Sequence, residues 1–161
     1  MEQYDIVVLG LGITGYATIS YCEKFGKSVA VTDNREKPPL RERLEKSLPN
    51  IKASLGSYDY EMLSRAKRVV VSPGVSPGSE VIAWLKENNK ETISDIDLFL
   101  ENYSGKIIAI TGSNGKSTTV KMLYDLINLT GKSTAMIGNI GKPALSLLEA
   151  NNSKIFDWVV L

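Results

Sequence analysis

Residues 107–119 read IIAITGSNGKSTT. The run Ile107–Ile110 is apolar and, apart from Ala109, β-branched, a composition typical of a strand buried on both faces of a sheet. Gly112 and Gly115 allow the backbone to curl so that successive N–H groups point at a bound anion. The apolar residues after this loop recur with helical spacing, and the N-terminal end of a helix attracts anions. A strand, a glycine-containing loop and a helix in this order predict a phosphate-binding loop in an α/β fold.

The loop is shorter than the usual P-loop pattern, G-x-x-x-x-G-K-[ST]. That pattern would place the first glycine at position 110, where Ile110 stands, so Gly112 is the first glycine here. Lys116 would supply a mobile cation to the outer phosphates of a nucleotide, and Ser117 a hydroxyl group to Mg²⁺. The alternative is an ordinary strand–helix turn with an exposed lysine, but the strand before the loop and the helix after it favour phosphate binding.

Composition narrows the possible classes of protein. The chain has 161 residues, enough for one large domain or two small ones, and its 43% hydrophobic and 23% charged residues are typical of a soluble globular protein. A net charge of +1 offers no electrostatic reason to bind nucleic acid, and no apolar run is long enough for membrane insertion. The single cysteine, Cys22, excludes an internal disulfide, and the acidic start at 1–5 does not resemble a signal peptide. We therefore expect a cytoplasmic location. We also expect a monomer, an expectation that does not follow from composition.

A second glycine motif lies near the start of the chain. The apolar run Ile6–Leu9 predicts a buried strand, and Gly10–Gly15 completes the pattern G-x-G-x-x-G before a predicted helix. A second strand over residues 28–32 ends at Asp33, which lies eighteen residues after Gly15. A strand, a glycine turn, a helix and an acidic residue at this spacing are typical of a dinucleotide-binding βαβ unit.

The alternation of strands and helices continues to residue 93. We expect helices over residues 40–48, 60–66 and 80–88, and strands over residues 51–55, 68–71 and 91–93. This order predicts a parallel, doubly wound, Rossmann-like domain over residues 1–93. The loop Ser72–Pro77 contains two prolines and a glycine, and it is either a plain strand-to-helix loop or a rigid backbone contact to a ligand.

The remaining residues, 94–161, predict a linker and the first part of a P-loop ATP-binding domain. Ser94 is expected to cap a short linker helix, and a strand over residues 133–137 and a helix over residues 143–150 follow the phosphate loop. A third strand begins at residue 156 and reaches Leu161. Because P-loop enzymes often hold Mg²⁺ with an acidic residue at the end of a neighbouring strand, we expect a protein cut short just before that residue.

These two motifs together resemble the Mur ligase family. Thr111–Thr118 is similar to the short P-loop of that family, and Gly10–Gly15, Ser72–Gly74, Ser94–Asp97 and Asn139–Gly141 resemble its D-glutamate-adding members. The resemblance implies ATP- and Mg²⁺-dependent amide formation in peptidoglycan precursor synthesis. D-Glutamate would be joined to the small-molecule substrate UDP-MurNAc-L-Ala through an acyl phosphate.

The resemblance also implies roles for individual residues, with Lys116 as the catalytic cation and Ser117 as the metal ligand. The expected ATP-binding residues are Gly112, Ser113, Asn114, Gly115, Lys116, Ser117, Thr118 and Thr119. The expected UDP-sugar-binding residues are Gly12, Ile13, Thr14, Asp33, Asn34, Arg35, Ser72, Gly74 and Asn139. The family's metal-ligating histidine, carbamylated lysine and amino-acid-binding domain have no counterpart in these residues, so we expect the chain to bind the UDP-sugar without catalysing the reaction.

Three other interpretations remain open. Gly10–Gly15 with Asp33 would suit a fragment of an NAD(P)-dependent oxidoreductase, although such an enzyme does not need the second phosphate loop. Lys116 and Ser117 would suit a stand-alone nucleotide-binding module or a kinase. The third interpretation is a related Mur ligase that adds an amino acid other than D-glutamate.

Overall fold

The computed structural model describes residues 3–138, 141–149 and 156–161. The chain divides into two compact units, Met1–Leu98 and Phe99–Leu161. The division falls inside helix α5 (Asp95–Asn102), shortly after the boundary expected at residue 93. The N-terminus of α5 has a capping box, because the Ser94 hydroxyl accepts a hydrogen bond from the Asp97 amide and the Asp97 carboxylate accepts one from the Ser94 amide.

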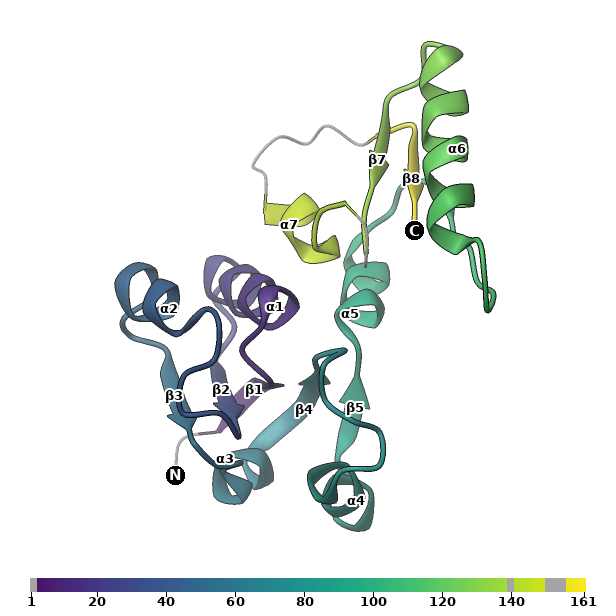
Figure 1. Ribbon diagram of the computed structural model, residues 1–161. Helices are drawn as coiled ribbons and strands as arrows, with labels where there is room; N and C mark the ends of the chain where they lie inside the picture. Colours follow the sequence, from purple (N-terminus) through teal and green to yellow (C-terminus); the bar gives the residue numbers. More distant parts are fainter. Residues whose placement is uncertain (1–2, 139–140, 150–155) are drawn as a thin grey trace. The chain divides into compact units, whose positions relative to one another are not determined.

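The first unit is built on a parallel five-stranded sheet (Figure 1). Its strands are β1 (Tyr4–Leu9), β2 (Val29–Asp33), β3 (Lys52–Leu55), β4 (Ala66–Val71) and β5 (Glu91–Ile93). They lie in the order β3-β2-β1-β4-β5, and Val7 of β1 pairs with Ala30 of β2 and Val69 of β4. The chain order reverses direction at β1, so the carboxyl ends of β1 and β4 flank the crevice where ligands bind in such sheets. The expected parallel α/β fold is confirmed.

Helices cover both faces of this sheet. Figure 1 shows α1 (Ile13–Lys24) and α2 (Arg41–Ser47) on one face, with α3 (Tyr60–Ser64) and α4 (Glu80–Glu87) on the other. The central strand β1 is buried from Ile6 to Leu9, as its run of apolar residues predicts.

The second unit has a smaller parallel sheet in the order β6-β8-β7. Its elements are β6 (Ile107–Ile108), α6 (Lys116–Leu129), β7 (Thr134–Met136), α7 (Ala144–Glu149) and β8 (Trp158–Val160). Ile107 pairs with Val159, and Thr134 pairs with Trp158 on the other side of β8. The strand, loop and helix expected around the phosphate loop are therefore present.

The expected burial of the strand before the loop is wrong. Ile107 and Ile108 are only half-buried and Ala109 is exposed. The physical reason is that β6 lies at the edge of its sheet and pairs with β8 alone. Helix α6 likewise buries Val120 but leaves 58% of Met122 and 55% of Leu126 exposed, so its apolar residues are not confined to the face packed on the sheet.

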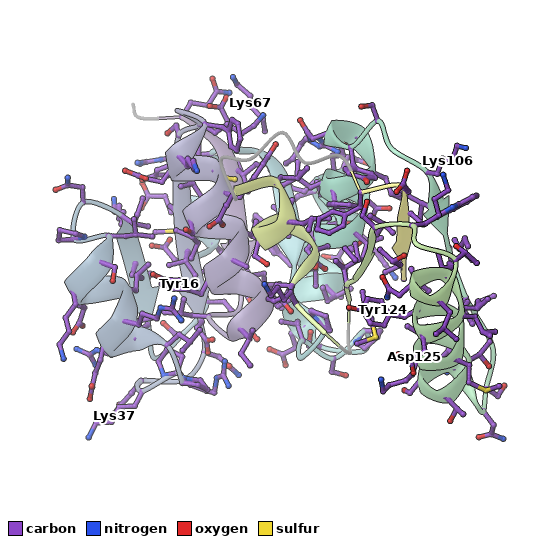
Figure 2. All side chains as sticks on the ribbon, turned by 90° about the horizontal axis from the view of Figure 1, so that it is seen from above. Tyr16, Lys37, Lys67, Lys106, Tyr124 and Asp125 are labelled. Carbon is purple, nitrogen blue, oxygen red and sulfur yellow. The ribbon has the colours of Figure 1, made fainter. Side chains whose placement is uncertain are left out.

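Charged side chains lie on the outside of both units. Lys37 and Lys67 of the first unit and Asp125 of the second project outward in Figure 2 and are exposed. Over the described residues, no helix combines the length and the apolar composition needed to cross a membrane.

Candidate functional site

A tight glycine turn joins β1 to α1. Gly10 has φ of +99°, a left-handed conformation that favours glycine. A Cβ atom at Gly15 would lie 2.0 Å from the carbonyl oxygen of Gly10, a distance that no real contact allows. Gly12 is the N-cap residue of α1 and has open space around it. The first and third glycines of the motif therefore make the turn, while the second leaves room for a ligand.

The turn presents unpaired backbone donors at the N-terminus of α1. The amides of Gly12, Ile13, Thr14 and Gly15 donate no hydrogen bond to any described residue, whereas the amide of Tyr16 bonds the Gly12 carbonyl at 2.9 Å. Free amides at a helix N-terminus suit a phosphate or diphosphate group.

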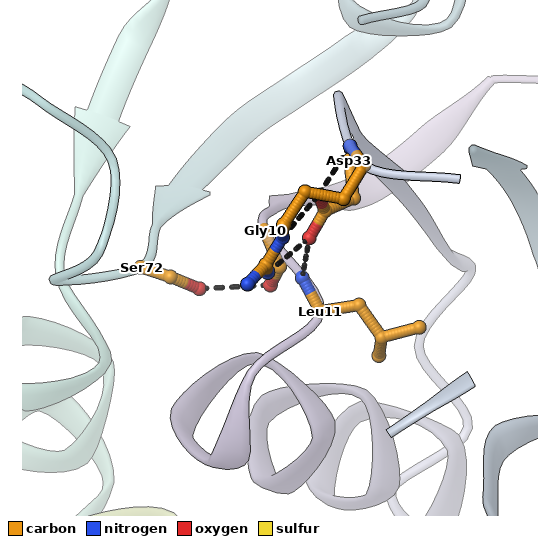
Figure 3. Close-up of polar contacts among 5 residues, drawn as sticks. Gly10, Leu11, Asp33 and Ser72 are labelled. Carbon is orange, nitrogen blue, oxygen red and sulfur yellow. Dashed lines mark hydrogen bonds and ion pairs between the residues drawn. The ribbon is translucent and has the colours of Figure 1, made fainter. Parts of the chain in front are cut away.

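The carboxylate of Asp33 ties this turn to the end of β2 (Figure 3). Its Oδ2 accepts a hydrogen bond from the Leu11 amide at 2.7 Å and one from Nη2 of Arg35 at 2.6 Å. Its Oδ1 accepts hydrogen bonds from the amide and from Nε of Arg35, both at 2.9 Å. The Asp33 side chain is only 2% exposed, while that of Arg35 is 51% exposed. The pair therefore places a guanidinium group at the carboxyl edge of the sheet.

Two opposing effects set the charge of this pair. Burial of Asp33 acts to raise its pKa, but hydrogen bonds from Arg35 and Leu11 outweigh burial and hold the pKa below its ordinary value. The hydrogen bond from Arg35 to Asp33 also raises the pKa of the Arg35 guanidinium. The carboxylate and guanidinium are therefore both charged at neutral pH, and the Arg35 donors that Asp33 does not engage remain free for a ligand.

The loop after β4 packs against the glycine turn. The Ser72 side chain is buried and its hydroxyl donates a hydrogen bond to the Gly10 carbonyl at 2.9 Å (Figure 3). Gly74, two residues later, is exposed and has no atom near the position of a Cβ. Ser72 thus fixes the turn, a role that its assignment as a ligand contact did not anticipate, and Gly74 offers open backbone.

The structure gathers eight of the nine expected UDP-sugar residues along the carboxyl ends of β1, β2 and β4. Gly12, Ile13 and Thr14 follow β1, Asn34 is exposed beside the Asp33–Arg35 pair, and the loop after β4 completes the group. Asn139 lies outside the described residues.

The phosphate loop of the second unit is open to solvent. Gly115 adopts a left-handed conformation at the N-cap of α6, with φ of +76°, and residues 111–119 are all exposed. The amides from Gly112 to Thr118 donate no hydrogen bond to any described residue. Nζ of Lys116 contacts the carbonyl oxygens of Gly112 and Ser113 of its own loop. The loop thus has free amides and a nearby cation, the donors that a nucleotide phosphate requires.

The residues around Ser117 supply only part of a Mg²⁺ site. The Ser117 hydroxyl is exposed on the first turn of α6. Within residues 3–138, 141–149 and 156–161, no group of three or more histidine, cysteine, aspartate or glutamate residues could hold a metal ion. The loop therefore fits the phosphates of a nucleotide, and Ser117 fits one coordination position of a metal bound to them.

A parallel α/β unit with a glycine turn and a buried acid, followed by a second unit with a short P-loop, defines a class of nucleotide-binding proteins. Residues 4–94 match the family model described as the Mur ligase MurD-like N-terminal domain. The chain therefore belongs to the MurD-like Mur ligases.

Curated relatives agree with this family. The chain is 40% identical over 149 residues to the UDP-N-acetylmuramoylalanine–D-glutamate ligase of Psychrobacter arcticus, an alignment that covers 92% of this chain and 31% of that protein. It is 42% identical over 142 residues to the same ligase of Psychrobacter cryohalolentis, covering 88% of this chain and 30% of that protein. The chain thus spans about a third of the length of these relatives.

Solved structures agree on the fold. A UDP-N-acetylmuramate:L-alanyl-γ-D-glutamyl-meso-diaminopimelate ligase from Neisseria meningitidis superposes with a TM-score of 0.56 at 20% identity, over 99% of this chain and 52% of that one. The UDP-N-acetylmuramate–alanine ligase of Thermotoga maritima superposes with a TM-score of 0.53 at 19% identity, over 88% of this chain and 35% of that one.

Proposed function

We propose that this chain provides the UDP-sugar-binding unit and the phosphate loop of an ATP-dependent ligase that adds D-glutamate to UDP-MurNAc-L-Ala. The relatives at 40% and 42% identity carry the name of a D-glutamate ligase, which supports this choice over a ligase for another amino acid. The proposed activity belongs to peptidoglycan precursor synthesis, and we propose a cytoplasmic monomer acting on small molecules.

The observation that carries the proposal is the set of free amides and the charged pair at one edge of the first sheet. The amides of Gly12–Gly15 would bind the diphosphate of the UDP-sugar, because they are unpaired and lie at a helix N-terminus. Arg35, held by Asp33, would contact the uridine end, and the open backbone at Gly74 would face the same ligand.

The phosphate loop would bind the second substrate, ATP. Amides of Gly112–Thr118 would hold the phosphates, and Lys116 would leave the loop carbonyls to contact the transferred group. Mg²⁺ bound to the phosphates and to Ser117 would supply positive charge to the transferred group.

The reaction proceeds in two displacements. The L-alanine carboxylate attacks the γ-phosphorus, the bond to ADP breaks, and an acyl phosphate forms. The D-glutamate amine then attacks the acyl carbon, phosphate leaves, and the amine loses a proton. Lys116 would stabilise the negative charge on the phosphoryl group in the first displacement.

The 161-residue chain alone should bind the UDP-sugar without forming the amide. The groups proposed to bind UDP lie within the first unit, apart from Asn139. The described residues offer no cluster of carboxylates for a metal. Without a site for D-glutamate, the reaction would lose the advantage of positioning its two reactants, which is worth on the order of 7–11 kcal/mol of the barrier.

Titration calorimetry with UDP and with NADH tests the proposed ligand against the oxidoreductase alternative. We expect UDP to bind and NADH to give no saturable signal. Saturable NADH binding with no UDP binding would contradict the proposal.

A further inference from the structure

The loop between β3 and α3 lies directly against the end of β2, a contact that no local sequence pattern indicates. The Gly56 amide donates hydrogen bonds to the carbonyl oxygens of Asp33 and Arg35 at 3.0 and 3.2 Å. The Thr32 hydroxyl accepts one from the Asp59 amide at 2.9 Å and donates one to the Ser57 carbonyl at 3.3 Å. These bonds on both sides of Tyr58 fix its backbone beside the Asp33–Arg35 pair.

The Tyr58 side chain is half-buried, and its ring packs against the apolar core of the first unit. Burial and the nearby Asp33 carboxylate raise the pKa of the phenol, although the Arg35 guanidinium acts in the opposite direction. Tyr58 is therefore a neutral phenol at physiological pH and lies close enough to both charges to interact with them.

Among the described residues, the structure shows no hydrogen bond to or from the Tyr58 hydroxyl. Tyr58 follows the carboxyl end of β3 on a loop that is bonded to the end of β2, and a tyrosine hydroxyl can donate to a carbonyl oxygen or accept from an N–H or O–H group. A nucleoside offers all of these groups on its base and ribose.

We propose that Tyr58 is a nucleoside-contacting residue, whose hydroxyl hydrogen-bonds the uridine moiety beside Arg35. This inference rests on the proposed binding of a UDP-sugar and adds Tyr58, from the loop between β3 and α3, to the residues that bind it. The alternative is that Tyr58 has only a structural role, in which its ring packs beside the core and its hydroxyl contacts only water.

Tyr58→Phe tests the proposal because it removes the hydroxyl and keeps the ring. Titration calorimetry should show UDP binding weakened about 3- to 10-fold, the range expected for one hydrogen bond, while the thermal unfolding midpoint stays at the wild-type value. The matched control is Tyr60→Phe, because Tyr60 is exposed and its ring contacts Trp84 at 5.1 Å between centroids. We expect the control to bind UDP as the wild type does.

A second ligand locates the contact. UDP-MurNAc-L-Ala carries the same nucleoside, so Tyr58→Phe should weaken its binding by the same factor as for UDP. Wild-type affinity of Tyr58→Phe for UDP, or a loss confined to the sugar-bearing ligand, would overturn the inference while leaving the proposed function intact. Failure of the wild-type chain to bind UDP would overturn both.

Discussion

Gly15→Ala should unfold the glycine turn, because the added Cβ would lie 2.0 Å from the Gly10 carbonyl oxygen and 3.1 Å from Oγ of Ser72. The first clash is with backbone, so no side-chain rotation relieves it. Overpacking of this kind costs about 1–3 kcal/mol, and displacing Gly10 also breaks its hydrogen bond from Ser72, worth about 0.5–1.5 kcal/mol. We expect a loss of about 1.5–4.5 kcal/mol in the free energy of unfolding of the first unit.

The matched control is Gly12→Ala in the same turn. Gly12 has φ of −97°, a value that alanine readily adopts. No atom lies within 4 Å of the position that a Cβ at residue 12 would take. Alanine there should leave stability unchanged or raise it by about 0.4–1 kcal/mol. Both variants would be compared by urea unfolding in a Trp158→Phe background, where Trp84 of α4 alone reports on the first unit. A Gly15→Ala variant as stable as Gly12→Ala would refute the packing argument.

Three further predictions follow from the same contacts. Arg35→Ala should weaken UDP binding at least about 10-fold by calorimetry, because a charged donor is lost, while Arg41→Ala on exposed α2 should not; the reverse order would place the ligand elsewhere. Asp33 has a folded-state pKa below its ordinary value of 3.8, so its charge stabilises the fold above that pH and ceases to do so as pH falls through the folded pKa. Asp33→Asn should therefore be less stable than wild type at pH 7, with a gap that narrows toward pH 2; a constant gap in acid unfolding would contradict this sign. Hydrogen exchange should show more protection in residues 5–93 than in residues 107–161, because the second sheet has strands of two or three residues, and equal protection would contradict it.

The elements around the glycine turn could be predicted because their signals are local. The apolar run of β1, the glycines of the turn and the start of α1 lie within a few residues of one another. Asp33 is the last residue of the next strand, β2. The parallel order of the sheet follows from the alternation of strands and helices.

The contacts that shape the site could not be predicted, because they join residues far apart in the chain. The bond from Ser72 to Gly10 spans 62 residues, and the bonds from the loop around Tyr58 to the end of β2 depend on the pairing of β2 with β3. The prediction that Ile107 is buried was wrong for a related reason. Its burial depends on which strands flank β6 and not on the composition of β6 itself.

The central claim is that the 161-residue chain binds the UDP-sugar mainly through its first unit and lacks a complete catalytic site. The most direct test is calorimetry with UDP-MurNAc-L-Ala, paired with a phosphate-release assay containing ATP, Mg²⁺ and D-glutamate. We expect saturable binding of the UDP-sugar and no D-glutamate-dependent phosphate release. Absence of binding would contradict the assignment of the glycine turn and the Asp33–Arg35 pair, and D-glutamate-dependent phosphate release would contradict the claim that the catalytic site is incomplete.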